Sequence, residues 1–253
     1  MQIANILPNY WVNQLYKYGS VATTVLPELK INFSGTDKSM IYLDSKQIYR
    51  LLISHIVKLP KGVLNWCSEL ELSDFQLKTS LTFAHRCCLS TFDRVFQYKI
   101  ITNILPTNDY LARYRVKDSN ICSKCDTEFD SVYHSLYGCV KVVPIISNIF
   151  SLIVDKCKAI GHINMMDFFF GIPGIEYDGV NQVLIELKKF IFYDWKAEVC
   201  VDELCARFTL KIIKLIVKEK TIFLSSKKID RFNTKWENFK YIYDFRGPDI
   251  HII

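Results

Sequence analysis

Glycine and proline are scarce in this chain, with nine glycines and seven prolines among 253 residues. Both residue types are common in turns, so their scarcity argues against a many-stranded sheet and favours long helices. Long apolar runs are lacking as well. The nearest candidates, 142–154 and 208–224, are too short or carry lysines, whereas a membrane helix needs about 20 apolar residues. We therefore expect no membrane-spanning segment.

We also expect no secretory leader, because Met1-Gln2-Ile3-Ala4-Asn5 places no basic residue before an apolar run. The nine cysteines are an odd number, and they are sparse for a disulfide scaffold in a chain of this length. We expect an intracellular protein of the cytoplasm or the nucleus, not a secreted one. In that reducing environment the cysteines are thiols or metal ligands.

Apolar residues are abundant, since half of the chain is hydrophobic and 14% is aromatic. Such a composition supports a sizeable core and argues against disorder. Apolar positions recur with helical spacing, and the sequence therefore predicts a mostly α protein. The expected helices are one near 48–55 that Asp44 or Ser45 caps and Pro60 and Gly62 end, a short segment from Trp66, one that Ser90 or Thr91 caps, 108–114 behind the cap Thr107, 142–160, 181–199, 202–225, and 230–243.

Three regions follow from this pattern. Residues 1–43 read as an N-terminal arm or the remnant of an upstream region, and 44–160 read as a helical region. Residues 161–253 read as a basic helical region, beginning near the Gly/Pro-rich turn 171–174. In its last helix, aromatic residues fall on one face, at Phe232, Trp236, Phe239 and Tyr243.

The sharpest pattern is a cluster of cysteine and histidine within 118–140. Cys122 and Cys125 are two residues apart, and His134 and Cys139 follow with four residues between them. The first gap lets two thiolates of a tight turn face one ion, and a short helix can present the second pair. Three sulfurs and one imidazole complete a tetrahedral shell with no open position, which is typical of a structural Zn²⁺ site. The sequence thus predicts a zinc knuckle embedded in a helical domain.

The residues around the knuckle form a longer ordered pattern. Phe96-Gln97-Tyr98-Lys99-Ile100-Ile101 and Ile104-Leu105-Pro106-Thr107-Asn108 precede it, and His134-Ser135-Leu136-Tyr137-Gly138-Cys139 closes it. This order resembles the zinc-binding region near the C-terminal end of LINE-type (non-LTR) retrotransposon reverse transcriptases. Glu128 and Asp130 lie near, but slightly displaced from, the acidic pair that this family carries before the histidine. The resemblance extends loosely over about residues 40–245, and only 92–139 carries sharp motifs.

The resemblance implies RNA, or the RNA–DNA hybrid near a polymerase, as a partner, and a reverse transcriptase domain upstream. A polymerase active site needs paired aspartates for two-metal phosphoryl transfer, and no Asp-Asp pair occurs in this chain. A nucleophile–base pair and a glycine-rich phosphate loop are not recognisable either. We therefore expect a non-catalytic, zinc-containing nucleic-acid-binding module rather than an enzyme.

Two sets of basic residues are candidates for contacts with phosphates. One brackets the knuckle among tyrosines that can stack on bases. The other lies along one helical face within 207–246, a segment with eleven basic and four acidic residues. The candidates are Arg94, Lys99, Arg113, Arg115, Lys117 and Lys124 in the first set, and Arg207, Lys211, Lys214 and Lys218 in the second.

Other interpretations stay open at this point. The helix face of the second basic set can equally be an ordinary solvated surface. The alternative function is a zinc-stapled protein-interaction domain, which docks on a polymerase or another partner through the aromatic stripe of 232–243. Cys87 and Cys88 are expected to be buried thiols, and a second metal site that combines Cys200 and Cys205 with Cys157 or His162 is disfavoured.

Overall fold

The computed structural model describes residues 30–33, 36–39, 44, 46–47, 60–70, 74–157, 160–195, 199–244 and 251–252. The chain divides into two compact units, 1–58 and 59–253. The first unit therefore runs past the arm expected over 1–43. The second unit contains residues 59–160 of the first predicted helical region and the whole of the second region, and helices from either side of residue 160 pack on each other within it. The protein is mostly α-helical, as the sequence predicts.

In the first unit, β1 (Lys30–Phe33) and β2 (Thr36–Ser39) form an antiparallel hairpin in which Lys30 pairs with Ser39. Asp44 makes the predicted helix cap. Its carboxylate accepts a bond from the Gln47 N–H (2.7 Å), and the Gln47 side-chain oxygen accepts one from the Asp44 N–H (3.0 Å). This reciprocal pair is a capping box. The helix expected over 48–55 and the arm residues up to 29 lie outside the described residues.

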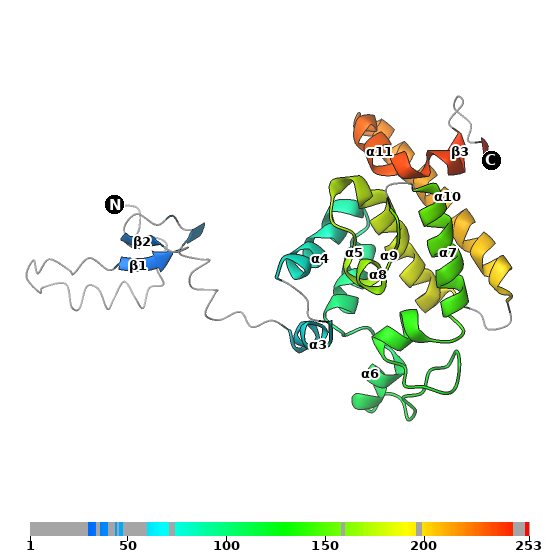
Figure 1. The fold of residues 1–253 in the computed structure, drawn as a ribbon, viewed down its shortest axis with the longest axis horizontal. Helices are drawn as coiled ribbons and strands as arrows, with labels where there is room; N and C mark the ends of the chain where they lie inside the picture. The colour runs from blue at the N-terminus through cyan, green and yellow to red at the C-terminus, as the bar shows by residue number, and fades with distance from the viewer. Residues whose placement is uncertain are drawn as a thin grey trace, which may run out of the picture. The chain divides into compact units, whose positions relative to one another are not determined.

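The second unit is a bundle around one central helix, α9 (Asp178–Tyr193), which is buried along nearly its whole length. Figure 1 shows α4 (Asp74–Cys87) and α5 (Thr91–Ile101) on one side of α9, and α7 (Val143–Lys156) and α10 (Val201–Ser225) on the other. The remaining elements are α3 (Lys61–Leu70), α6 (Asn108–Arg113), η2 (His134–Gly138), α8 (Met165–Phe170), η3 (Ile175–Tyr177), α11 (Ile229–Trp236), η4 (Glu237–Ile242), and the strand pair β3 (Tyr243–Asp244) and β4 (His251–Ile252).

Several predicted boundaries differ from the structure. Helix α3 begins at Lys61, so Gly62 lies in the first turn of a helix, whereas the residues directly before Pro60 lie outside the described part of the chain. Gly62 is needed there, since a Cβ at this position would lie 1.9 Å from the Thr102 carbonyl oxygen. The helix expected over 142–160 ends at Lys156, and the one expected to reach 199 ends at Tyr193. Helices α4 and α8 were not predicted.

The aromatic stripe of the last helix is part of the core. Phe232, Trp236 and Phe239 are at most 1% exposed, so they pack inside this chain rather than on a partner. The side chain of Tyr243 lies outside the described residues. The stripe therefore cannot be the docking surface that the alternative interpretation assigns to it, because its surface is already covered.

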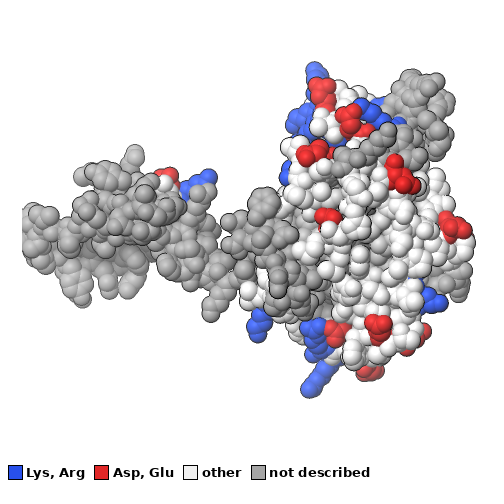
Figure 2. All heavy atoms as spheres, in the orientation of Figure 1, with Lys and Arg blue, Asp and Glu red and all other residues white. Residues whose placement is uncertain are grey.

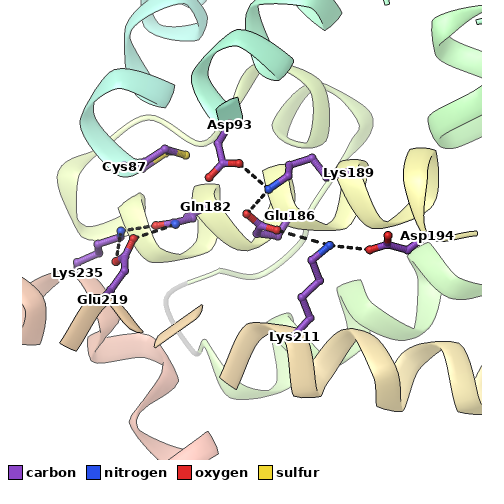
Figure 3. A network of polar contacts seen from close by, with 10 residues as sticks. Cys87, Asp93, Gln182, Glu186, Lys189, Asp194, Lys211, Glu219 and Lys235 are labelled. Carbon is purple, nitrogen blue, oxygen red and sulfur yellow. Dashed lines mark hydrogen bonds and ion pairs between the residues drawn. The ribbon is translucent and has the colours of Figure 1, made fainter. Parts of the chain in front are cut away.

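Polar side chains on α9 are buried with their partners. The Lys188 ammonium, which is fully buried, donates to the Gln97 side-chain oxygen and to the Phe168 carbonyl, both at 2.7 Å. Burial lowers the pKa of Lys188 to about 7. Figure 3 shows two further groups along the same helix. Lys189 contacts Asp93 (2.5 Å) and Glu186 (2.7 Å), and Gln182 donates to Glu219 (2.9 Å).

Three helices end in a left-handed residue that is not glycine. Asn103, Arg115 and Lys227 have φ values of 55°, 57° and 56° and follow α5, α6 and α10. At α10, the N–H of Lys228 bonds to the Phe223 carbonyl (2.9 Å) and the N–H of Lys227 to the Leu224 carbonyl (3.1 Å). This is the Schellman arrangement, in which glycine is the preferred residue. A chain poor in glycine thus places polar residues at these positions.

Candidate metal centre

The first two candidate ligands lie on a narrow turn. Ile121 and Phe129 pair across it as an antiparallel bridge, and the Cys122 N–H donates to the Glu128 carbonyl (2.8 Å). The N–H of Asp126 donates to the Cys122 carbonyl (2.8 Å), and Asp126 takes a left-handed conformation with φ of 56°. The backbone is therefore folded back on itself between Cys122 and Phe129. This fold brings Cys122 and Cys125 to the same side.

The second pair of ligands lies on a single π-helical turn, η2. The N–H of Cys139 donates to the carbonyl of His134 (2.9 Å), which is a bond between residues five apart. This wider turn places residues five apart on one face, as the His134–Cys139 spacing requires. The prediction of a short helix that presents both ligands is confirmed, with π rather than α geometry.

The four ligand atoms converge. All of them lie within 4.8 Å of one another. The sulfurs of Cys122 and Cys139 are 4.0 Å apart, and the Cys125 sulfur lies 3.3 Å from Nε2 of His134. Tetrahedral Zn²⁺, with bonds of ~2.3 Å to sulfur and ~2.0 Å to nitrogen, sets its ligands about 3.5 to 3.8 Å apart. The Cys₃His group therefore has the composition and the spacing to hold one metal ion.

Two further side chains orient the ligands. Glu128 contacts Nδ1 of His134 at 3.1 Å, which leaves Nε2 directed at the other three ligands. The Thr127 hydroxyl donates to the Cys125 sulfur (3.2 Å). A carboxylate behind a ligating histidine fixes the ring and raises its basicity. The sequence placed Glu128 near the histidine only through the family resemblance; its six-residue spacing from His134 carries no signal of the contact.

The thiols of the centre differ in acidity. Burial raises the pKa of Cys122 to about 12 and also raises that of Cys139. The hydroxyl of Thr127 is the main cause that lowers the pKa of Cys125 to about 6, and backbone N–H groups act in the same direction. Metal ions bind thiolates, so at neutral pH an incoming ion must displace protons from Cys122 and Cys139.

The segment before the knuckle is tied to it. The Asn108 side-chain nitrogen donates to the Ile121 carbonyl (2.6 Å), directly before Cys122. The buried Asp130 in turn accepts the Asn108 backbone N–H (2.8 Å). Thr107 makes the predicted cap of α6 by accepting the Tyr110 N–H (3.4 Å). The Leu-Pro-Thr-Asn motif therefore supports the turn that carries the first two ligands.

The centre is continuous with the hydrophobic core. Cys122, Cys139 and Leu136 are fully buried and belong to the same core cluster as α9. Tyr137, which lies between the last two ligands in sequence, packs on Phe168 of α8 with ring centroids 5.6 Å apart. A metal ion at this site would fix the position of side chains that the bundle itself buries.

The basic residues around the knuckle are mostly engaged. Four of the six make contacts with neighbouring protein groups: Arg94 with the Cys88 carbonyl (2.7 Å), Arg113 with Asp109, Lys117 with Asn108 (2.7 Å), and Lys124 with Ser135 (2.9 Å). Lys99 and Arg115 have no polar partner within the described part of the chain. Five acidic residues accompany five basic ones over 108–141, so this corner has no excess of positive charge. The tyrosines expected to stack on bases do include exposed rings, at Tyr98 (51%) and Tyr114 (66%).

The second basic set lies on α10 as predicted. Arg207 pairs with Glu203 (2.6 Å) and Lys211 with Asp194 (2.7 Å). Lys214 and Lys218 are exposed, and neither meets a polar partner among the described residues. Figure 2 shows charged side chains gathered toward the α11 end and the α6 end of the second unit, with a mostly uncharged surface between.

The other cysteines do not assemble a second site in the described residues. The four-residue group described above is the one cluster of potential metal ligands found there. Cys87 and Cys88 are 1% exposed, with their sulfurs 3.5 Å apart, as expected for buried thiols. Cys157 is buried against the Asn238 carbonyl, whereas Cys200 is exposed.

No protein-family model matches the chain, and a search of curated proteins finds no match. Among the described residues, no helix is both long enough and apolar enough to cross a lipid bilayer.

Proposed function

We propose that this chain is a non-catalytic nucleic-acid-binding module of the kind found near the C-terminal end of retrotransposon reverse transcriptases, with RNA as its main partner. The observation that carries the proposal is the bond from Asn108 to the Ile121 carbonyl (2.6 Å). It joins the Leu-Pro-Thr-Asn motif to the metal-binding turn. Through this hydrogen bond, the two motifs on which the family resemblance depends form one structural unit.

Zinc is the proposed metal. Three thiolates and one imidazole suit its soft character and its tetrahedral preference, and they leave no position for water or substrate. The ion would then be structural: it would hold the corner made by α6 and η2 onto the bundle. No step of a reaction is assigned to it.

The proposed RNA contacts are mainly to phosphates. Residues 211–236 contain eight basic and two acidic residues, so the excess positive charge lies on α10 and α11. Contacts of this kind position a strand without reading its sequence, and they release counterions. The module is therefore expected to bind many RNA sequences with similar affinity.

The experiment is a binding titration of the zinc-loaded chain with a fluorescent single-stranded RNA at two salt concentrations. We expect the affinity to fall steeply as salt rises, by about tenfold or more between 50 and 200 mM for a few phosphate contacts. A scrambled RNA of equal length should bind equally well. Affinity that does not respond to salt would contradict the proposal.

A second candidate function is protein interaction, and one surface favours it. Phe92 and Tyr193 are 56% and 51% exposed with ring centroids 5.9 Å apart, and Val95 beside Phe92 is 45% exposed. Exposed apolar side chains that lie together are typical of contact surfaces. In this alternative the metal serves only to stabilise the fold, and an upstream polymerase domain is the expected partner. A folded, metal-loaded chain that binds no RNA at low salt would favour it.

A further inference from the structure

A small pocket of about 260 Å³ lies where α4, α9, α10 and α11 meet. Arg86, Arg231, Thr234 and Lys235 line it together with Asp178, and Leu89 and Ile175 form its apolar rim. It lies apart from the metal centre: none of its lining residues belongs to α6, η2 or the knuckle turn. Neither the resemblance nor the metal site accounts for its charges.

Three cationic side chains and a single carboxylate line this pocket. Arg86 donates through Nε to Asp178 (2.6 Å) and through Nη2 to the Gly174 carbonyl (2.9 Å). Burial raises the pKa of Asp178, while the charges of Arg86, Lys235 and Arg231 all act to lower it. The guanidinium of Arg86 has further N–H groups beyond the two in use. One carboxylate therefore faces more positive charge than it can balance.

The charge of Lys235 is balanced outside the pocket. Figure 3 shows its side chain turned toward Glu219 and Gln182. The Lys235 ammonium lies 2.6 Å from Glu219, and Trp236 donates to the same carboxylate at 2.9 Å. The charge of Arg86 is thus neutralised by Asp178, and the charge of Lys235 is neutralised by Glu219. The charge left over is that of Arg231.

Arg231 is exposed, and its side chain forms no hydrogen bond or ion pair within the described part of the chain. It stands in the first turn of α11 next to the exposed Asp230, and the exposed Lys227 and Lys228 precede the helix. The pocket also lies at the N-terminal end of the 16-residue helix α9, where the helix dipole is positive. A guanidinium with free N–H groups in such a place suits a phosphate, which accepts paired hydrogen bonds from it.

We propose that this pocket binds the terminal phosphate of a single nucleic-acid strand. A terminal phosphate carries more negative charge than an internal one and is linked to the strand on one side only, so it enters a pocket of about 260 Å³ more readily than an internal phosphodiester does. Arg231 and the remaining N–H groups of Arg86 contact the phosphate oxygens. The sugar of the terminal nucleotide lies against Leu89 and Ile175, and Lys227 and Lys228 attract the following phosphates. This inference rests on the proposed function, because it assumes that a nucleic-acid strand reaches the α11 end.

The test compares three RNAs of one sequence, which carry a 5′-phosphate, a 3′-phosphate or no terminal phosphate. One of the phosphorylated strands should bind about tenfold more tightly than the unphosphorylated one, as one charge-assisted hydrogen bond contributes. Arg231→Gln should abolish this preference. Lys141→Gln, which removes an equal charge from an exposed residue next to the knuckle, should retain it.

The outcomes separate this inference from the proposed function. If the protein binds all three RNAs equally, the terminal-phosphate pocket is wrong and the proposed function stands. If it binds none, the proposed function is wrong, and inorganic phosphate then tests the pocket by itself. At ionic strength matched with chloride, phosphate should raise the melting temperature of the wild-type protein and not that of Arg231→Gln. Equal shifts in both proteins would overturn the pocket.

Discussion

The two ends of the helical unit differ in how their charges are used. At the α6 end, acidic and basic residues are equal in number over 108–141, and most cations contact a neighbouring protein group. Along α10 and on α11, residues 211–236 include eight basic and two acidic residues, and Lys214, Lys218 and Arg231 have no polar partner in the described structure. The excess of positive charge therefore lies away from the metal ligands, although Lys99 and Arg115 near the knuckle also have no polar partner in the described structure. We infer that stability and RNA binding are separated in space, and each prediction below tests that separation.

Removal of the metal should have the largest effect. Zinc-finger peptides gain about 10 to 16 kcal/mol from zinc, and here the ligands Cys122 and Cys139 belong to the main core. Chelation, or Cys139→Ser, should lower the stability of the whole bundle by several kcal/mol, because unfolding of the corner exposes Leu136 and its neighbours. Circular dichroism during heating measures this loss.

Cys200→Ser is the matched control, because Cys200 is exposed and far in sequence from the centre. It should not lower the melting temperature, because Cys200 is the N-cap of α10 and serine is favoured at that position. If chelation left the melting curve of the wild-type protein unchanged as well, the metal would have no structural role. The claim that the metal-binding end stabilises the bundle would then be wrong.

The affinity for the metal should depend steeply on pH. The pKa of Cys122 is raised to about 12 and that of Cys139 is also raised, so both thiols hold protons at pH 7 in the metal-free protein. Cys125, with a pKa lowered to about 6, has already lost its proton there. Each ion bound near pH 7 should therefore release about two protons, and the affinity should rise about 100-fold per pH unit.

Competition with a chelator at several pH values between 6.5 and 8 measures this slope. Since the raised pKa values favour the protonated thiols, the affinity must rise with pH and fall with acid. A slope near zero would mean that Cys122 and Cys139 are thiolates before the metal arrives. RNA binding at the α11 end should show no such dependence while the metal stays bound.

A smaller effect is expected from the support of the knuckle turn. Asn108→Ala removes the bond to the Ile121 carbonyl (2.6 Å) and leaves this acceptor without its side-chain partner. The loss should cost about 1 to 3 kcal/mol of unfolding free energy, measured in urea. Asn233→Ala, at an exposed position of α11, should cost almost nothing. Equal losses for both variants would show that the Leu-Pro-Thr-Asn motif does not hold the knuckle.

The predictions that the structure confirms depend on patterns of residues close in sequence. The ligands of the centre lie within 18 residues of one another, so their spacing alone predicts that they converge. The caps of α5 and α6 are likewise set by neighbours, at Ser90 and Thr107, although Ser90 makes no side-chain bond. Such features depend on atoms close in sequence, which a single chain displays directly.

The errors that bear on function concern contacts between distant residues. The stripe of Phe232, Trp236 and Phe239 shows that one helix face is apolar, but not whether the same chain covers it. The balance of Lys235 by Glu219, sixteen residues away on another helix, is equally invisible in the sequence. Free and engaged cations can be told apart only when such partners are known. For that reason the ten basic candidates were drawn from both ends alike.

The smallest effects should come from the left-handed positions that close α6 and α10. Arg115→Gly and Lys227→Gly each place glycine where φ is positive, 57° and 56°, and should raise stability by about 0.5 to 1 kcal/mol. Their effects on RNA should differ, because only Lys227 lies at the end with free positive charge. Lys227→Gly should weaken binding and reduce the slope of log affinity against log salt by about 0.7, the value for one phosphate contact on a single strand. Arg115→Gly should leave both unchanged, and Asn103→Gly serves as the uncharged control for the change in backbone. The two variants change charge and backbone in the same way and differ only in the end of the molecule that they alter. If Arg115→Gly weakened RNA binding as much as Lys227→Gly, the knuckle would therefore be part of the RNA-binding surface.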